Sequence, residues 1–144
     1  MKKRCRRSSA FSLIELMMVV AIISILASVA IPKFGNMVIK ARESSVKGSL
    51  GALRSAFSIY YSDNEGHFPL AGDLDSALAG GGKYMPSIPQ CRIPAPGDHA
   101  ATSGITDFAG AYTDVGDWMY FASTGAITAN CTHPDSTGRV WNTN

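Results

Sequence analysis

An apolar segment at residues 11–31 constrains what this chain can fold into more than any other feature of its sequence. It is about 21 residues long and carries a single charge, Glu15. As an α-helix, such a segment rises about 31 Å, which matches the hydrocarbon core of a bilayer. The apolar part of a secretory signal is shorter, at about 7 to 15 residues. The sequence therefore predicts a membrane-spanning helix over 11–31.

The residues before this segment are strongly basic. Five positive charges with no acid among them occupy the leader: Lys2, Lys3, Arg4, Arg6 and Arg7. Basic residues next to a span favour the cytoplasmic side. We therefore expect the N-terminus in the cytoplasm and the chain after Pro32 on the outer side of a bacterial inner membrane, in the periplasm.

Glu15 is the one charged side chain within the span. A carboxylate inside a bilayer costs about 2 to 3 kcal/mol or more unless it finds a partner. One interpretation places Glu15 close enough to the cytoplasmic interface to reach headgroup water. The other pairs it with a positive charge on another subunit within the membrane.

The segment 10–19, AFSLIELMMV, follows the short basic leader and resembles the class III signal of type IV pilins and type II secretion pseudopilins. The resemblance implies that prepilin peptidase cuts between Ala10 and Phe11 and that Phe11 becomes an N-methylated N-terminus. It also implies that Glu15 pairs with the α-amino group of Phe11 on a neighbouring subunit and sets the register of a filament. Ala10 departs from the usual Gly before the cut, so slower processing or a selective peptidase is expected.

Charge is distributed unevenly along the chain. Residues 32–62 hold five basic residues and one acid, whereas residues 63–144 hold three basic residues and nine acids. The stalk is therefore basic and the head acidic, which argues against a nucleic-acid-binding surface on the head.

The cysteines divide between the leader and the head. Cys5 leaves with the leader, so Cys91 and Cys131 remain as a pair in an oxidising compartment, and we expect a disulfide between them. Free thiols are the alternative. A metal site built from these two cysteines with His99 and His133 is disfavoured, because their spacing does not match the usual zinc motifs.

Helical periodicity continues beyond the span to about residue 62, although Pro32 is expected to kink the helix. One apolar face of this segment, the upper stripe, consists of Val46, Leu50, Leu53, Phe57 and Tyr60. A second face, the lower cluster, consists of Phe34, Met37, Val38 and Ala41. We expect the upper stripe to pack on the head of the same chain and the lower cluster to pack on helices of other subunits.

A line of basic residues recurs every seven positions along the stalk: Lys33, Lys40, Lys47 and Arg54. A solvated face is the favoured interpretation of this basic line. Contact with lipid or with acidic heads of adjacent subunits is the alternative.

The helix is expected to end at 63–66, where Gly66 can close it in the left-handed conformation and Pro69 prevents it from resuming. Residues 60–69 and 83–89 resemble the helix exit and following loop of the type II secretion major pseudopilin.

The rest of the head is expected to combine one short helix with a small sheet. The helix is predicted at 74–78, and segments 118–122 and 126–131 read as a β-hairpin. Segment 139–141 is a candidate third strand. The predicted fold class is α+β, with a long N-terminal helix packed against a small antiparallel sheet, as in type IV pilins.

The predicted organisation has three parts. Residues 1–10 form a cytoplasmic leader that is removed, residues 11–62 form the long helix with 11–31 in the membrane, and residues 63–144 form the head.

The head shows no signature of catalysis. Its three histidines lie in separate loops without a nucleophile motif, a phosphate-binding loop or a metal motif, so we expect no enzyme. Loop acids are of the type that bind calcium, and the resemblance to major pseudopilins implies a calcium site in the C-terminal loops. The candidate ligands are Asp114, Asp117 and Asp135, and a solvated surface is the alternative. No other cofactor is expected.

The resemblance favours a structural filament subunit that polymerises through helix 11–62, most simply a type II secretion major pseudopilin that drives protein secretion. Its implied partners are other copies of itself, membrane lipid before assembly, prepilin peptidase, an inner-membrane platform protein and an assembly ATPase. One alternative is a type IV pilus pilin for adhesion, motility or DNA uptake. An alternative of another class is a singly anchored periplasmic binding or enzymatic domain, for which Phe11 and Glu15 would be incidental.

Overall fold

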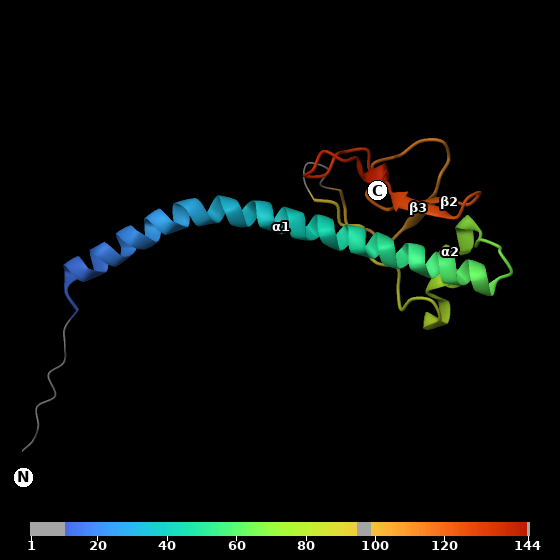
Figure 1. Cartoon of the computed structure of the whole chain (residues 1–144), viewed down its shortest axis with the longest axis horizontal. Helices are drawn as coiled ribbons and strands as arrows, with labels where there is room; N and C mark the ends of the chain where they lie inside the picture. Colours follow the sequence, from blue (N-terminus) through green and yellow to red (C-terminus); the bar gives the residue numbers. More distant parts are fainter. Residues whose placement is uncertain (1–10, 95–98, 144) are drawn as a thin grey trace, which may run out of the picture. The chain divides into compact units, whose positions relative to one another are not determined.

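The structure is a computed structural model that describes residues 11–94 and 99–143. The predicted leader, including Ala10, lies outside these residues. The first and longest element is helix α1 (Leu13–Asp63), and short helices and a small mixed sheet follow it along the chain (Figure 1). The chain divides into two compact units between Met37 and Val38, and each is described by itself.

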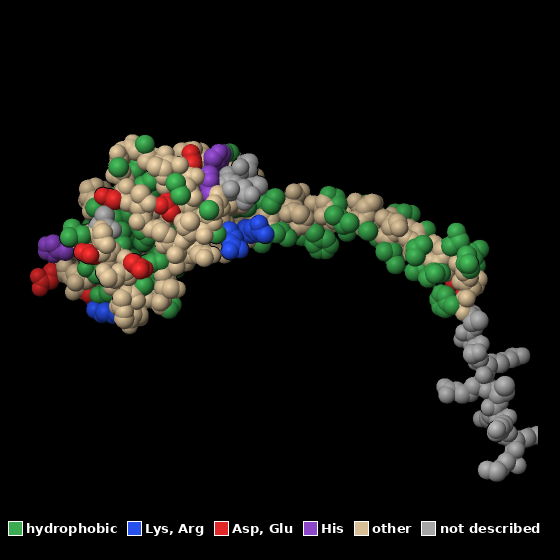
Figure 2. All heavy atoms as spheres, turned by 180° about the vertical axis from the view of Figure 1, so that it is seen from behind, with side chains coloured by type: hydrophobic (Ala, Val, Ile, Leu, Met, Phe, Trp, Pro, Cys, Tyr) green, Lys and Arg blue, Asp and Glu red, His purple; other side chains and the backbone are tan. Residues whose placement is uncertain are grey.

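The first unit contains the apolar part of α1. Its large hydrophobic side chains are exposed all round the helix, for example Ile25 at 68% and Ile31 at 70%, and Figure 2 shows such side chains in green along its surface. Among the described residues, α1 is the one helix long and apolar enough to cross a membrane. The helix continues through Pro32, and the kink expected there stays a prediction.

The end of α1 follows from local signals. Its last residue is Asp63, and Gly66 then takes a positive φ of 82° while its N–H donates to the carbonyl of Tyr61 at 2.9 Å. A residue without a Cβ adopts this left-handed conformation at little cost, and the hydrogen bond satisfies a free carbonyl of the last turn. The helix exit predicted at 63–66 is therefore confirmed.

The second unit packs the head on the upper stripe. Val46, Leu50, Leu53 and Phe57 are each at most 3% exposed, and Tyr60 packs against this core. The ring of Phe57 stacks on that of Tyr120 with centroids 5.1 Å apart. The prediction for this face is confirmed.

A three-stranded mixed sheet carries the rest of the core. Strand β2 (Trp118–Phe121) pairs antiparallel with β3 (Ala126–Ala129), which confirms the hairpin. Strand β1 (Ile105–Asp107) pairs with β2 in parallel, so the sheet order is β1-β2-β3. The α+β class is confirmed, but the expectation of an all-antiparallel sheet is wrong, because β1 pairs in parallel. The sequence did not indicate β1, since a strand of three residues is too short to show a periodic pattern.

The strand predicted at 139–141 is also wrong. This segment contributes an isolated bridge between Pro134 and Val140 and then a 3₁₀ turn, Trp141–Thr143, with Trp141 buried. The carboxylate of Asp135 accepts hydrogen bonds from the backbone N–H groups of Thr137 and Arg139 at 2.8 and 3.0 Å. These bonds close a tight turn, which competes with pairing in the sheet.

A short helical region lies between α1 and the sheet. Helix α2 (Leu74–Leu78) matches the prediction, and its two leucines are buried in the core. The 3₁₀ turns Ala71–Asp73 and Gly80–Gly82 flank it.

Candidate functional site

Glu15 caps its own helix in the single chain. Its Oε2 accepts a hydrogen bond from the backbone N–H of Ser12 at 2.9 Å, and the carbonyl of Ser12 accepts from the N–H groups of Glu15 and Leu16. Ser12-x-x-Glu15 is the sequence pattern of a capping box, in which the third helical residue reaches back to the N-cap. Sequence reasoning missed this role, although the pattern was there to be found. Pairing of Glu15 with the α-amino group of Phe11 on another subunit stays a prediction.

The lower cluster is exposed in the single chain. Phe34 and Met37 are each 64% exposed, Val38 is 50% exposed, and Ala41 is also exposed. Exposed apolar surface of this extent on a helix is typical of an interaction site. Packing of this face on helices of other subunits stays a prediction.

The basic line does not form one solvated face. Lys33 and Lys40 are exposed, but Nζ of Lys47 lies 2.6 Å from Oδ2 of Asp135, and Arg54 donates to the carbonyl of Ile127 at 3.0 Å. Lys47 is partly buried against an acid of the head, so the expectation of a solvated position is wrong there, whereas Arg54 stays exposed although its guanidinium contacts the head.

Glu43 and Lys47 together hold the turn at 135–139 against α1, and we call these two residues the stalk clamp. The two oxygens of Glu43 accept hydrogen bonds from the N–H of Ser136 at 2.7 Å and from its hydroxyl at 2.5 Å. The side chain of Asp135 is fully buried. Its burial raises the pKa, but hydrogen bonds from Lys47, Thr137 and Arg139 outweigh that effect and hold the pKa of Asp135 well below its usual range.

The three calcium candidates have separate partners. Asp135 faces the Lys47 ammonium, which leaves little need for a second cation. Asp117 accepts hydrogen bonds from the Asn130 amide at 2.6 Å and from the Thr106 hydroxyl, and the fully buried Asn130 ties β1, β2 and β3 together through it. Asp114 lies in a different cluster, so the described residues do not present these three as one ligand set.

Asp114 belongs to a cluster with His99, Cys131 and His133, whose ligand atoms all lie within 4.8 Å of one another. Nε2 of His99 lies 3.3 Å from Sγ of Cys131, Nδ1 of His133 lies 3.5 Å from the same sulfur, and Nδ1 of His133 lies 3.9 Å from Oδ1 of Asp114. Hydrogen bonds from the backbone N–H and hydroxyl of Thr132 hold the pKa of Asp114 below its usual range despite partial burial. Sequence spacing disfavoured a metal site here, but the loops bring these side chains together.

The two head cysteines are both buried and both free thiols in the structure. Burial, with lesser contributions from Asp117 and Cys131, raises the pKa of Cys91 to about 12. Burial also raises the pKa of Cys131, against a smaller opposing effect of the His133 backbone N–H. The disulfide between Cys91 and Cys131 stays a prediction.

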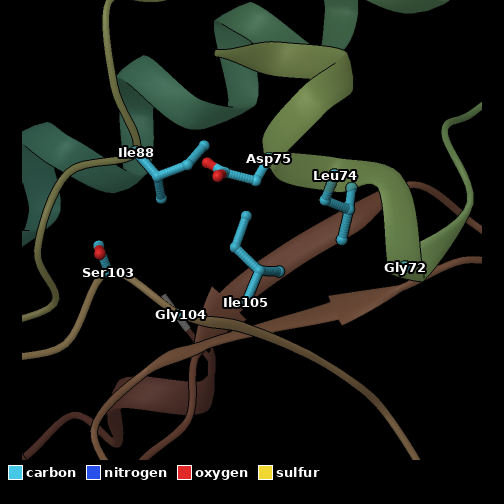
Figure 3. A pocket seen from close by; sticks show the side chains of 7 residues that line it. All are labelled: Gly72, Leu74, Asp75, Ile88, Ser103, Gly104 and Ile105. Carbon is cyan, nitrogen blue, oxygen red and sulfur yellow. The ribbon is translucent and has the colours of Figure 1, made fainter. Parts of the chain in front are cut away.

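A shallow cavity of about 290 Å³ lies between α2 and the start of β1 (Figure 3). Leucine, isoleucine and glycine line most of it, and of the described lining residues Asp75 alone is titratable. An acid–base pair needs two such groups. The cavity therefore offers no arrangement for proton transfer between lining side chains.

Comparisons with known proteins find a known motif at the N-terminus and sequence similarity that extends beyond it. Residues 5–31 match the model of the prokaryotic N-terminal methylation motif. The chain is 38% identical over 78 residues to the type IV major pilin protein PilA of Myxococcus xanthus, covering 54% of this chain and 36% of that protein. It is 41% identical over 83 residues to the fimbrial protein EcpC of Eikenella corrodens, covering 54% of this chain and 51% of that protein.

A longer match joins the chain to a second group of relatives. It is 27% identical over 134 residues to the type II secretion system core protein G of Aeromonas hydrophila, covering 78% of this chain and 94% of that protein. By contrast, the chain spans only 36% of the length of PilA and 51% of the length of EcpC. No solved structure matches the chain. The chain thus carries the N-terminal methylation motif and is similar to both type IV pilins and type II secretion pseudopilins, which supports a structural subunit of this kind.

Proposed function

We propose that this chain is a subunit of a type IV pilus-like filament, and more finely a type II secretion major pseudopilin. The observation that carries the proposal is the first unit: a helix with the methylation motif whose apolar side chains are exposed on all sides. Such a helix is stable only in lipid or among other apolar helices. A subunit that lies first in the membrane and then among the helices of a filament would have this exposed apolar surface covered in both states.

The proposed mechanism is mechanical. Prepilin peptidase removes residues 1–10 at the cytoplasmic face, Phe11 is N-methylated, and the chain waits in the inner membrane with its head in the periplasm. An assembly ATPase and a platform protein then move it into a filament, where helices of other copies replace lipid around α1. The head keeps its own core throughout, because the upper stripe is already buried within the chain.

The choice of a pseudopilin is supported by where the similarities lie. The match to core protein G includes 78% of this chain, which reaches well into the head, whereas the match to PilA includes 54%. A type IV pilus pilin is the second candidate, because the relatives of higher identity are pilus proteins. A singly anchored periplasmic domain is the third.

The experiment that tests assembly replaces Glu15 in the native host. Glu15→Gln keeps an oxygen that can accept the Ser12 N–H bond but removes the charge needed to pair with the Phe11 α-amino group. We expect membrane insertion and cleavage to persist, and sheared filaments to be lost. Asp107→Asn, an exposed acid of β1, is the matched control and should assemble normally.

Intact mass of the recovered protein supplies the second readout. A mass for residues 11–144 plus one methyl group supports the processing step. Normal filaments from Glu15→Gln would contradict the pairing role of Glu15, whereas an uncleaved N-terminus and no filaments from the wild type would favour the anchored-domain alternative. In a deletion strain, loss of exported proteins from the medium supports the pseudopilin, and loss of surface pili with secretion intact supports the pilus pilin.

A further inference from the structure

We propose that His99, Asp114, Cys131 and His133 form a structural binding site for a transition metal of the zinc type. This inference concerns the head alone and does not depend on filament assembly. Three segments that are distant in sequence supply the ligands: residue 99, the loop at 114, and the segment that follows β3. Their ligand atoms converge within 4.8 Å of one another.

Two of the separations between these atoms match those on one tetrahedral ion. A sulfur at about 2.3 Å and a nitrogen at about 2.0 to 2.1 Å from one zinc ion lie about 3.5 Å apart. The observed separations from Sγ of Cys131 are 3.3 Å to Nε2 of His99 and 3.5 Å to Nδ1 of His133. The separation of 3.9 Å between His133 Nδ1 and Asp114 Oδ1 needs to shorten by only about 0.5 Å to match a nitrogen–oxygen pair on the same ion.

Neighbouring groups already orient the ligands. The carboxylate of Asp114 accepts hydrogen bonds from the Thr132 N–H at 2.6 Å and from its hydroxyl at 2.9 Å. The backbone N–H of His133 points at Sγ of Cys131 at 3.4 Å, a contact that stabilises a thiolate. Such outer contacts hold metal ligands in place and tune their basicity.

Gly116 makes room for one ligand. It has a φ of 83°, and a Cβ built there would lie 2.3 Å from Cβ of His99. Any side chain at 116 would therefore displace His99 from the cluster. The position of His99 in the cluster therefore depends on a glycine at 116.

The donor set identifies the class of ion. One sulfur, two imidazole nitrogens and one carboxylate suit Zn²⁺ and its spectroscopic substitute Co²⁺, whereas Ca²⁺ and Mg²⁺ prefer oxygen ligands. Four protein ligands complete a tetrahedral shell, so the site is structural rather than catalytic. Cys131 is buried and the other three ligands are partly exposed, which leaves a path for the ion.

This site and the predicted disulfide exclude each other. The sulfur of Cys131 can be a metal-bound thiolate or half of a disulfide with Cys91, but not both at once. Cys91 and Cys131 are both fully buried, and Cys91 is not in the cluster. The two cysteines are therefore a matched pair for the test.

The test titrates the full-length, detergent-solubilised and reduced protein with Zn²⁺ or Co²⁺ alone. We expect one ion per chain by elemental analysis, and a sulfur-to-cobalt charge-transfer band with the visible bands of tetrahedral Co²⁺. Cys91→Ala should bind as the wild type does, whereas Cys131→Ala should lose the charge-transfer band and at least about tenfold in affinity.

A second ligand variant separates loss of metal binding from misfolding, which replacement of the buried Cys131 could cause. His99→Gln changes a partly exposed ligand and should also lower affinity at least about tenfold, while His67→Gln, a histidine outside the cluster, should not. The proposal is overturned if the reduced wild type and Cys91→Ala bind no Zn²⁺ or Co²⁺. It is also overturned if binding survives in His99→Gln and Cys131→Ala, or if Ca²⁺ displaces the bound Co²⁺ at comparable concentration.

Discussion

Helix α1 belongs to both units of the chain, but its large apolar side chains are exposed in the first unit and form part of a buried core in the second. In the first unit Leu26 is 65% exposed, whereas in the second unit Leu53 is fully buried in the core that it shares with residues of the sheet. Both residues are leucines in the interior of α1. Helix α1 is therefore a core helix over one part of its length and presents an exposed apolar surface over the other. Head stability should therefore depend on the second part alone.

The largest expected effect comes from the buried leucine. Leu53→Ala should lower the free energy of unfolding of the head by about 3 kcal/mol, because it removes buried apolar groups from the core and leaves a cavity. Thermal unfolding followed by near-UV circular dichroism of the buried tryptophans measures it. Leu26→Ala is the control, and an equal loss from both variants would contradict the division of α1 into two regions.

A smaller effect is expected from the stalk clamp. Lys47→Met should cost about 2 kcal/mol of head stability, because it leaves the buried Asp135 carboxylate without its ammonium partner. Lys40→Met, one heptad earlier and exposed, is the matched control and should change stability by less than about 0.5 kcal/mol. If both lysines behave alike in chemical denaturation, the basic line is a solvated face after all.

The smallest expected effect is a pH dependence that also belongs to the second unit. The pKa of Asp135 is lower in the folded head than its value of about 3.9 in an unfolded chain. Its contribution to stability is therefore present above about pH 4 and is lost as the pH falls below that.

Melting temperatures between pH 3 and 7 measure this loss. Asp135→Asn should be less stable than the wild type at pH 7 and should show a flatter decline below pH 4. An unchanged decline in this variant would assign the acid sensitivity to other carboxylates.

Local signals explain what could be predicted in the head. The exit of α1 was predictable because Gly66 and Pro69 act on their own neighbours, and α2 because glycines bound a short apolar segment. The β2–β3 hairpin was predictable from two apolar runs around a short turn. The parallel strand β1 was not, because its pairing with β2 depends on a loop whose path no local pattern determines.

Among the candidate functional residues, too, roles that depend on distant parts of the chain were missed. The family resemblance predicted assembly roles for Phe11 and Glu15, but sequence reasoning overlooked the capping hydrogen bond between Ser12 and Glu15. It treated Lys47 as solvated because a heptad pattern does not reveal an acid 88 positions away. It also disfavoured the histidine–cysteine cluster, because ligand spacing is informative only when one loop supplies adjacent ligands.

The apolar span, the methylation motif, the length of α1 and the two faces of its outer part could all be read from the sequence. These features depend on residues one or two turns apart, whose interactions follow from helix geometry. Three features became visible only in the folded chain: the mixed sheet, the clamp of Glu43 and Lys47 on the turn at 135–139, and the convergence of His99, Asp114, Cys131 and His133. Those contacts join segments far apart in the chain, and burial of one common core is what brings them together.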